Sequence, residues 1–431
     1  MDQYTKEIFI KSSQTAIIQV VGISARLVTS IFLGRVLGAS GLGDVNLINQ
    51  IITILMVLSM FGMDHVLVKK ISIGLSKNNL DAIGSIIFTA VVTNTVIALL
   101  LTSLILFFSN SISHFFDSDQ IGLPLTISVI ILLPQTLGVI FAVAANGFNK
   151  VWQSRLLKDF STSIFVLLGL SIMYILPLEF TLFNVILVYV LSRLLTALIS
   201  YGYFKKLYHP VWIKSPIDKS MVAMAKPLLF VSATTLLASS IDIIMLGWLS
   251  SSKDVGLYTV ATRLVLFIAF FLQITNAAIS PKIASFYAEG KIADIRNMVN
   301  KVTFWLIIIG ILSFLFFIIL GKPVLGLWGE EFVAAYTALI ILCIGQVFNV
   351  STGCSGVLLI MTGNEKVYSY LTGVFLFLNV FLNYILINAY GIQGAAYATS
   401  FTITLENIVR VIIAKKRTGI LTLPGIFKRL D

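Results

Sequence analysis

The longest polar interruption in this chain is Lys205–Lys226, KKLYHPVWIKSPIDKSMVAMAK. Six long apolar segments precede it and six more follow it. Its lysines outnumber its single acidic residue, Asp218, and two prolines, Pro210 and Pro216, prevent one continuous helix from running through it. The stretch predicts a cytoplasmic connector, residues 205–220, between two halves of a membrane protein.

Composition supports this interpretation. The 431 residues are 58% hydrophobic and 11% charged, whereas an ordinary soluble domain has roughly 25% charged residues. The apolar segments are about 20 residues long or longer, which is enough to cross a hydrocarbon core of roughly 30 Å. We therefore predict an all-α polytopic membrane protein. The net charge of +11 lies in short loops, so it indicates a basic membrane face, and no nucleic-acid partner is expected.

The apolar segments predict about twelve transmembrane helices in two six-helix lobes, residues 1–204 and 221–414, followed by a basic cytoplasmic tail, 415–431. The N-terminus is polar through Lys11, so no cleavable signal peptide is expected. Cys343 and Cys354 share one apolar span and are predicted to be buried thiols. The spans are predicted at 13–38, 44–68, 82–108, 121–147, 156–176, 180–204, 221–248, 256–281, 298–320, 332–361, 366–387 and 394–414.

The loops alternate in charge, which sets the predicted orientation. Most of the 30 basic residues fall in the loops on the side of the connector, including Lys77, Lys214 and Lys291. By the positive-inside rule this side faces the cytoplasm, and both termini lie there. The predicted external loops carry mainly acidic residues: Asp117, Asp119, Glu179, Asp254, Glu330 and Glu331.

The two halves resemble each other in sequence. A shift of 213 positions places Gly43 on Gly256 and Lys69 on Lys282 without a gap. Because six spans return the chain to its starting side, the halves would be parallel copies of one unit, as in transporters with two related lobes. Chance similarity between apolar helices is the alternative, and the aligned loop residues argue against it.

The repeated residues also carry a family resemblance. The stretch from Asp242 through Leu246-Gly247 and Asp254-Val255-Gly256-Leu257-Tyr258 to Ala261 resembles polysaccharide flippases of the multidrug/oligosaccharidyl-lipid/polysaccharide exporter superfamily, which has a MATE-like fold. A matching motif in the first half runs from Ala25-Arg26-Leu27 through Leu33–Gly38 to Gly41-Leu42-Gly43. Within this superfamily the chain resembles the O-antigen flippases of the Wzx type.

This resemblance implies a flippase that moves a polyprenyl-diphosphate-linked oligosaccharide, an O-antigen or another surface polysaccharide repeat unit, from the inner to the outer face of the bacterial cytoplasmic membrane by alternating access. Lipopolysaccharide assembly would then be its setting, and other membrane proteins of polysaccharide assembly would be its partners. An anionic diphosphate requires a cationic, water-filled cavity. Arginine suits this task because its planar guanidinium donates two parallel hydrogen bonds and stays charged.

Arginines within the predicted spans are therefore the candidate substrate-binding residues. Arg26 and Arg193 fall near the centres of the first and sixth spans, Arg263 lies inside the eighth, and Arg35 is near an external end. A charge there costs roughly 2.5–3.5 kcal/mol if it faces lipid, so these side chains should face the protein interior. We expect Arg26 and Arg263 to face a shared central cavity and to hold the diphosphate. The alternative for each is a structural pair with an acid such as Asp242.

Three other charged residues have separate interpretations. Arg410 follows Glu406 by one helical turn, so a structural salt bridge is predicted. Asp242, in the seventh span, and Asp64, beside His65, are candidates for coupling transport to a proton or sodium gradient, because an intramembrane carboxylate can take up a cation. Structural pairing is the alternative for both acids. No cofactor and no protein-bound metal are expected.

Two rival functions remain. A MATE-type cation or drug antiporter would share the twelve-helix plan, but the central charges here are mainly arginines, which favour an anionic substrate. A membrane enzyme of polysaccharide assembly is the other alternative. The longest predicted external loop, about Ser109–Gln120, is short, and no metalloprotease, P-loop or nucleophile-elbow motif is present in a suitable context. We therefore expect a transporter and not an enzyme.

Overall fold

The computed structural model describes residues 3–108, 116, 120–208 and 217–423. Within these ranges the secondary structure is helical and contains no strand, which confirms the predicted all-α fold. Several residues named above lie outside the described ranges: Asp117, Asp119 and Lys214, the last together with the rest of 209–216, which is half of the predicted connector.

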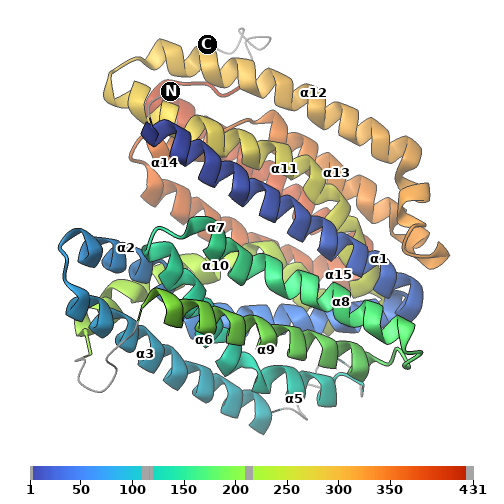
Figure 1. The fold of residues 1–431 in the computed structure, drawn as a ribbon. Helices are drawn as coiled ribbons and strands as arrows, with labels where there is room; N and C mark the ends of the chain where they lie inside the picture. The colour runs from blue at the N-terminus through green and yellow to red at the C-terminus, as the bar shows by residue number, and fades with distance from the viewer. Residues whose placement is uncertain (1–2, 109–115, 117–119, 209–216, 424–431) are drawn as a thin grey trace. The chain divides into compact units, whose positions relative to one another are not determined.

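The helices follow one another with short connections (Figure 1). The first part of the chain forms α1 (Gln3–Met60), α2 (Met63–Ser76), α3 (Leu80–Phe107), α5 (Gly122–Ile130), α6 (Leu132–Gly147), α7 (Val151–Arg155), the π-helical turn η1 (Leu156–Phe160), α8 (Ser161–Ile175) and α9 (Leu182–Leu207). The second part forms α10 (Lys219–Leu249), α11 (Ser252–Ala288), α12 (Ile292–Leu325), the 3-10 turn η3 (Glu330–Ala335), α13 (Tyr336–Ser351), α14 (Ser355–Met361) and α15 (Glu365–Thr418).

Nine helices of the described chain are long and apolar enough to cross a membrane, or ten when the bent pair α5–α6 counts as one span. At 58 and 54 residues, α1 and α15 are much longer than one crossing requires. Each contains a non-helical glycine, Gly38 with φ 69° and Gly391 with φ 54°. Dividing these two helices at their glycines gives twelve spans in the described residues, in agreement with the prediction.

Three predicted spans contain breaks that hydropathy does not reveal. The span at 44–68 is interrupted by Phe61 and Gly62, both with positive φ, and that at 121–147 bends by 42° where α5 meets α6. The span at 332–361 consists of η3, α13 and α14. The bend between α5 and α6 lies just before Pro134, which cannot donate the next helical hydrogen bond.

The described chain forms two compact units, which we call the N-terminal unit (residues 1–37 and 44–236) and the C-terminal unit (38–43 and 237–431). The boundary falls inside α10, so the first part of this helix belongs to the N-terminal unit. The predicted connector, by contrast, lies at 205–220, from the end of α9 to the beginning of α10, and its residues 209–216 are outside the described ranges. The predicted lobe boundaries stay a prediction.

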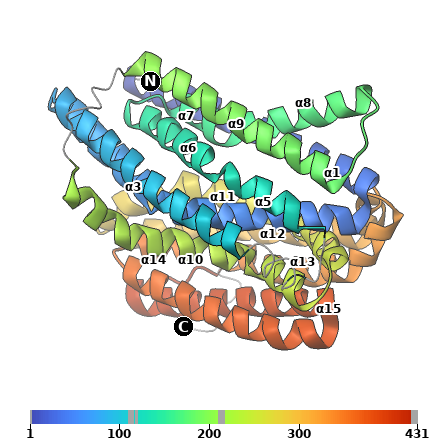
Figure 2. The same ribbon diagram turned by 90° about the horizontal axis from the view of Figure 1, so that it is seen from below.

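In the N-terminal unit, α6 packs against α3 on one side and α9 on the other (Figure 1, Figure 2). The contact with α9 is close because Gly138 has no side chain: a Cβ there would lie 2.7 Å from the Cα of Ala197. Residues of α2, α3 and α6 form an apolar core that includes the fully buried Met63, Ile71 and Ile140. Small residues at a helix contact let the two backbones approach.

The C-terminal unit repeats this construction. Its helix α13 packs against α12 and α15. A Cβ on Gly345 of α13 would lie 2.8 Å from the Cα of Ser400 on α15. In both units, therefore, the fourth and sixth predicted spans cross at a glycine. Cys343 is buried in α13 and Cys354 follows it, and both are free thiols, as predicted.

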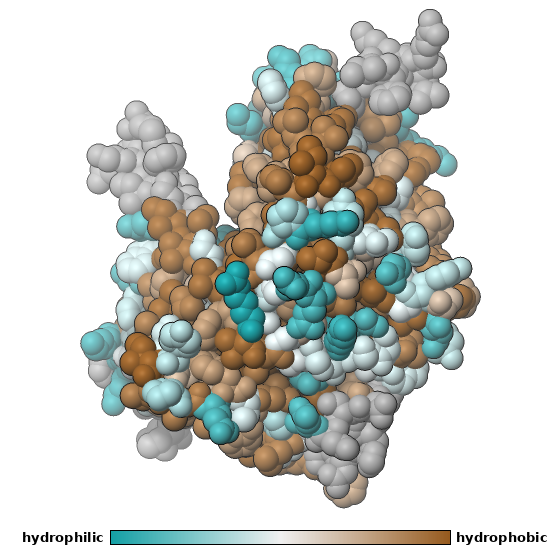
Figure 3. Space-filling model, turned by 90° about the vertical axis from the view of Figure 1, so that its right-hand side faces the viewer, coloured by the Kyte–Doolittle hydropathy of each residue, from teal (hydrophilic) through white to brown (hydrophobic). Residues whose placement is uncertain are grey.

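Side chains that face outward from the helices are largely apolar. Phe107, Phe230 and Phe377 are among the most exposed large hydrophobic residues. Figure 3 shows hydrophobic residues over much of the face that it draws, with polar side chains gathered in patches. A soluble monomer rarely exposes so much contiguous apolar surface, whereas lipid-facing helices require it. These helices identify a multi-pass membrane protein.

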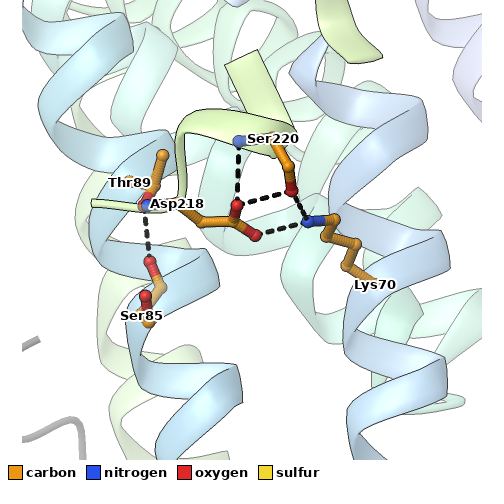
Figure 4. A network of polar contacts seen from close by, with 5 residues as sticks. All are labelled: Lys70, Ser85, Thr89, Asp218 and Ser220. Atoms are coloured by element: carbon orange, nitrogen blue, oxygen red, sulfur yellow. Dashed lines mark hydrogen bonds and ion pairs between the residues drawn. The ribbon is translucent and has the colours of Figure 1, made fainter. Parts of the chain in front are cut away.

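A polar clamp fixes the beginning of α10 within the N-terminal unit (Figure 4). The Lys70 ammonium of α2 forms an ion pair with Asp218 and donates to Ser220 Oγ at 2.8 Å. The backbone N–H of Asp218 donates to Thr89 Oγ1 of α3 at 2.8 Å. These contacts connect the helix to α2 and α3 where the chain leaves the predicted connector.

Candidate functional site

Arg193 is the most deeply buried of the four arginines predicted to bind substrate. It lies in the middle of α9, its exposed fraction is 8%, and its Nη2 donates to Asn49 Oδ1 of α1 at 2.5 Å. Its guanidinium carbon lies 5.9 Å from the centre of the Tyr189 ring, within range of a cation–π interaction. Both of these partners are neutral.

Arg26 lies on the first part of α1 and is exposed at the surface of the N-terminal unit. Its Nη1 donates to Ser163 Oγ of α8 at 3.3 Å. The π-helical turn η1 immediately precedes α8, and its Phe160 lies against α1, 3.7 Å from the position of a Cβ on Gly22. Such π-helical turns are frequent at functional sites. The chain thus places Arg26 beside a hydroxyl group and leaves its side chain accessible.

Arg35 and Arg263 occupy different surroundings. Arg35 is exposed and lies one turn before the non-helical Gly38 of α1. Arg263 is half-buried on α11, in the C-terminal unit, whereas Arg26 belongs to the N-terminal unit. The shared cavity of Arg26 and Arg263 stays a prediction.

Asp242 is the centre of a buried polar cluster in the C-terminal unit. It lies on α10 with 8% of its surface exposed. Its Oδ2 accepts a hydrogen bond from Tyr258 Oη of α11 at 2.5 Å and a longer one from Thr399 Oγ1 of α15 at 3.4 Å. Three helices therefore meet at one carboxylate, whose Oδ2 accepts from two hydroxyl groups and whose Oδ1 accepts from the Ile243 backbone N–H at 3.2 Å. Such a site can bind a proton or a small cation because hydroxyl oxygens can also act as ligands.

The second acidic candidate, Asp64, lies in the first turn of α2, directly after the break at Phe61–Gly62. Its Oδ2 lies 3.7 Å from His65 Nε2, and the histidine side chain is 62% exposed. A carboxylate in the first turn of a helix is stabilised by the helix dipole. The position of Asp64 is thus explained locally, as the structural alternative expects.

Arg410 and Glu406 form the predicted salt bridge, with 2.5 Å between Nη2 and Oε1. The same Nη2 donates to Thr372 Oγ1 at 3.0 Å, and the guanidinium carbon lies 4.6 Å from the centre of the Tyr368 ring. These contacts join the two halves of α15. Arg410 is neutralised within its own unit, so it is a poor candidate for substrate binding.

The partners of the predicted residues are mostly neutral polar side chains that sequence reasoning missed. Asn49, Ser163, Tyr258 and Thr399 each contact one of the predicted charges. The available signal was weak: Asn46, Asn49 and Gln50 are spaced along one face of an apolar span, a pattern that indicates a polar interior. Nothing in that pattern identifies Arg193 as the partner of Asn49.

Comparisons with known proteins are consistent with this construction. The sequence profile of the family described as polysaccharide biosynthesis protein matches residues 11–287, more than half of the chain. The MatE profile matches residues 227–385. The capsular polysaccharide biosynthesis protein CapF of Staphylococcus aureus is 27% identical over 275 residues, which cover 62% of this chain and 68% of CapF.

The solved structures that share the fold include a transporter and a flippase. A multidrug resistance MATE family transporter of the MOP superfamily, in an inward-facing conformation, has a TM-score of 0.78 and 14% identity, covering 94% of this chain and 98% of that one. The lipid II flippase MurJ, in an inward closed conformation, has a TM-score of 0.73 and 16% identity, covering 94% and 87%. A drug transporter and a lipid flippase thus have the same fold, so the fold alone does not decide between these activities.

Proposed function

Because this chain belongs to the polysaccharide biosynthesis protein family, we propose that it is a flippase for a polyprenyl-diphosphate-linked oligosaccharide. The observation that carries the proposal is this family match. The described residues of the matched chain form helices that are long and apolar enough to cross a bilayer. A membrane protein of this kind contributes to polysaccharide synthesis by moving an intermediate that cannot cross the bilayer unaided. Its proposed role in polysaccharide synthesis is transport and not catalysis.

The substrate proposed is the lipid-linked repeat unit of an O-antigen or another surface polysaccharide. Arg26, Arg35 and Arg193 of the N-terminal unit and Arg263 of the C-terminal unit are its proposed ligands. A guanidinium can hold a phosphate through two parallel hydrogen bonds, and Arg193, whose Nη2 donates to Asn49, would contribute its Nη1. The two units would expose these arginines alternately to each side of the cytoplasmic membrane, with both termini in the cytoplasm. Other membrane proteins of polysaccharide assembly are the proposed partners.

Ion coupling is proposed at Asp242. The carboxylate is buried on α10 and accepts hydrogen bonds from hydroxyl groups of α11 and α15, which suits uptake of a proton or a sodium ion. Asp64, whose Oδ2 lies 3.7 Å from Nε2 of the exposed His65, is the second candidate.

A cation or drug antiporter is the second candidate function. It is favoured by the MatE match to residues 227–385 and by the buried Asp242. A cation carrier requires carboxylates where its substrate binds, whereas the N-terminal unit offers Arg26 and Arg193. The balance of charges supports the anionic substrate.

Purified protein in proteoliposomes provides the test. Wild-type protein is expected to move a fluorescent polyprenyl-diphosphate oligosaccharide across the bilayer. Arg26→Ala and Arg263→Ala should each lower the rate roughly 10- to 100-fold, because charge-assisted hydrogen bonds contribute about 1.5–3 kcal/mol. Lysine should restore the rate only partly, since it lacks the bidentate fork.

Rates are compared per folded transporter. Wild-type rates for both alanine variants would refute the head-group role of these arginines. Transport of an organic cation, together with no transport of the lipid, would instead establish the antiporter.

A further inference from the structure

The charge of Arg193 has no counter-charge in the part of the protein that the structure describes. No described acidic side chain lies within 4.0 Å of its guanidinium, and its side chain is almost fully enclosed. By contrast, Arg410 of the C-terminal unit has Glu406 beside it. A buried, unpaired charge is unfavourable for folding, and proteins retain such a group mainly where it has a function.

Asn49 holds the guanidinium in a fixed orientation. The Asn49 amide donates from Nδ2 to the carbonyl of Val45 at 2.8 Å, so its Oδ1 faces Arg193 and accepts from Nη2. The Tyr189 ring lies beside the guanidinium. Nη2 of Arg193 is therefore held by Asn49. Because the guanidinium is planar, the direction of Nη1 is fixed as well.

Buried hydrogen-bond donors without a described partner remain on Arg193 and on the segment of α1 that holds it. Arg193 Nη1 and Gln50 Nε2 are both buried and have no partner among the described residues. Gln50 directly follows Asn49 on α1, the residue that contacts Arg193. Two donors, one of them charged, match a ligand that only accepts hydrogen bonds. An oxyanion has this character, and a cation does not.

We propose that Arg193 and Gln50 form a binding site for an oxyanion inside the N-terminal unit, with Asn49 as the residue that positions Arg193. The oxyanion is a phosphate oxygen or a sugar carboxylate of the transported lipid, so this inference rests on the proposed function. Such a site explains why no described acidic side chain is paired with Arg193. A permanent carboxylate there would bind the guanidinium and repel the anionic ligand.

The variant Asn49→Asp tests the site because it supplies that carboxylate with almost no change in shape. If Arg193 is only structural, the new ion pair should offset the lost hydrogen bond from Asn49 Nδ2 to the Val45 carbonyl and leave transport per folded protein unchanged. If Arg193 binds an oxyanion, the variant should still fold, yet its transport rate per folded protein should fall by about tenfold or more. Asn388→Asp, at an exposed position of α15, introduces the same charge as a control and should leave the rate unchanged.

Binding is measured separately from transport, as the rise in melting temperature of the full-length protein in detergent. Polyprenyl diphosphate without sugar and free glucuronic acid are the two probes. Stabilisation by the first alone assigns the site to phosphate, and stabilisation by the second alone assigns it to an acidic sugar. In either case the effect should be lost in Asn49→Asp and in Arg193→Gln, and reduced in Gln50→Leu.

The two proposals can fail independently. A wild-type protein that does not move the lipid refutes the flippase, whereas the melting experiment still reports on the oxyanion site. Wild-type transport by Asn49→Asp, or equal stabilisation of wild type and Arg193→Gln by the probes, would overturn the site and leave the flippase intact.

Discussion

Gly43 and Gly256 lie backbone against backbone in the C-terminal unit. A Cβ on Gly43 would lie 1.7 Å from the carbonyl oxygen of Ser252 and 3.0 Å from the amide nitrogen of Gly256. A Cβ on Gly256 would lie 2.0 Å from the carbonyl oxygen of Ala39. These two glycines are the pair that the internal repeat aligns with each other. Their equivalence in sequence therefore has a physical reason, because neither position leaves room for a side chain.

Alanine at either glycine should disrupt this contact. The atoms that the new methyl group would meet belong to the backbone and cannot rotate away, so Gly43→Ala and Gly256→Ala should each cost about 1–3 kcal/mol or more. Gly202→Ala is the matched control, since a Cβ on this helical residue meets nothing within 4 Å. That change should be neutral or stabilising, because alanine favours a helix.

Melting temperatures of the purified variants provide the comparison. Equal stability of Gly43→Ala and Gly202→Ala would contradict the close contact.

Asp242 should determine whether transport responds to an ion gradient. Asp242→Asn keeps the shape of the side chain and its hydrogen bonding to Tyr258, but it removes the negative charge that would bind a proton or a sodium ion. We expect its transport rate in proteoliposomes to become independent of imposed pH and sodium gradients. Tyr258→Phe removes one donor and keeps the carboxylate, so it should retain the dependence. Unchanged gradient dependence in Asp242→Asn would exclude this residue as the coupling site.

The clamp of Lys70 and Asp218 should stabilise the protein in a pH-dependent way. The hydrogen bond from Lys70, followed by that from Ser220, lowers the pKa of Asp218 below its usual value. A lowered carboxyl pKa stabilises the fold above the unfolded-state value of about 3.9, and this stabilisation is lost as the pH falls through the folded-state pKa. Because both side chains are partly exposed, the contribution should be about 1 kcal/mol or less.

This clamp is tested by the melting temperatures of Asp218→Asn and wild type across pH. Their difference should be constant from neutral pH down to about 5 and should shrink below about 4. The exposed pair of Glu289 and Lys291 serves as the control, and Glu289→Gln should change little at any pH. A difference between Asp218→Asn and wild type that grew on acidification would have the wrong sign for this clamp.

The twelve spans and the buried cysteines could be predicted from sequence because they depend on composition over about 20 residues. Breaks within spans could not, since apolar residues continue on both sides of Phe61–Gly62 and of Thr352–Cys354. In these places glycine supplies a positive φ that hydropathy does not register: Gly62 has φ 71° and Gly353 has φ 65°.

The candidate site was predictable only as a set of charges. The positions of Arg26, Arg193 and Asp242 within apolar segments were sufficient to select them. Their partners were not predictable, because Asn49 is 144 residues from Arg193 and Thr399 is 157 residues from Asp242. Only the helix packing brings such residues together. The salt bridge of Glu406 and Arg410 could be predicted because both residues lie on one helix, one turn apart.

The end of the described chain packs into the C-terminal unit, which predicts a stabilising role for the tail. After α15 ends at Thr418, the chain is no longer helical, and Ile420 and Thr422 are fully buried. Arg296 Nη2 of α12 donates to the Gly419 carbonyl at 2.9 Å. Thr422 Oγ1 donates to the carbonyl of Thr352 at 2.8 Å, at the break between α13 and α14. The tail thus satisfies a carbonyl that the broken helix leaves unpaired.

Two variants separate the hydroxyl group from the rest of the tail. Thr422→Val keeps the shape and removes the donor, so a buried carbonyl loses its partner at a cost of about 1–3 kcal/mol. A chain ending at Thr418 loses this bond and the buried Ile420 as well, and should be less stable still.

Cys354, two residues from Thr352, reports on the break between α13 and α14, because in a Cys343→Ser background it is the sole remaining thiol. It is 1% exposed in the intact protein, so maleimide labelling should be slow in the parent, faster in Thr422→Val and fastest in the shortened chain. Thr418→Val, an exchange at a hydroxyl that bonds only within its own helix and to the next turn, is the control and should label like the parent. Identical labelling rates in the shortened chain and the parent would show that the tail does not hold this break closed.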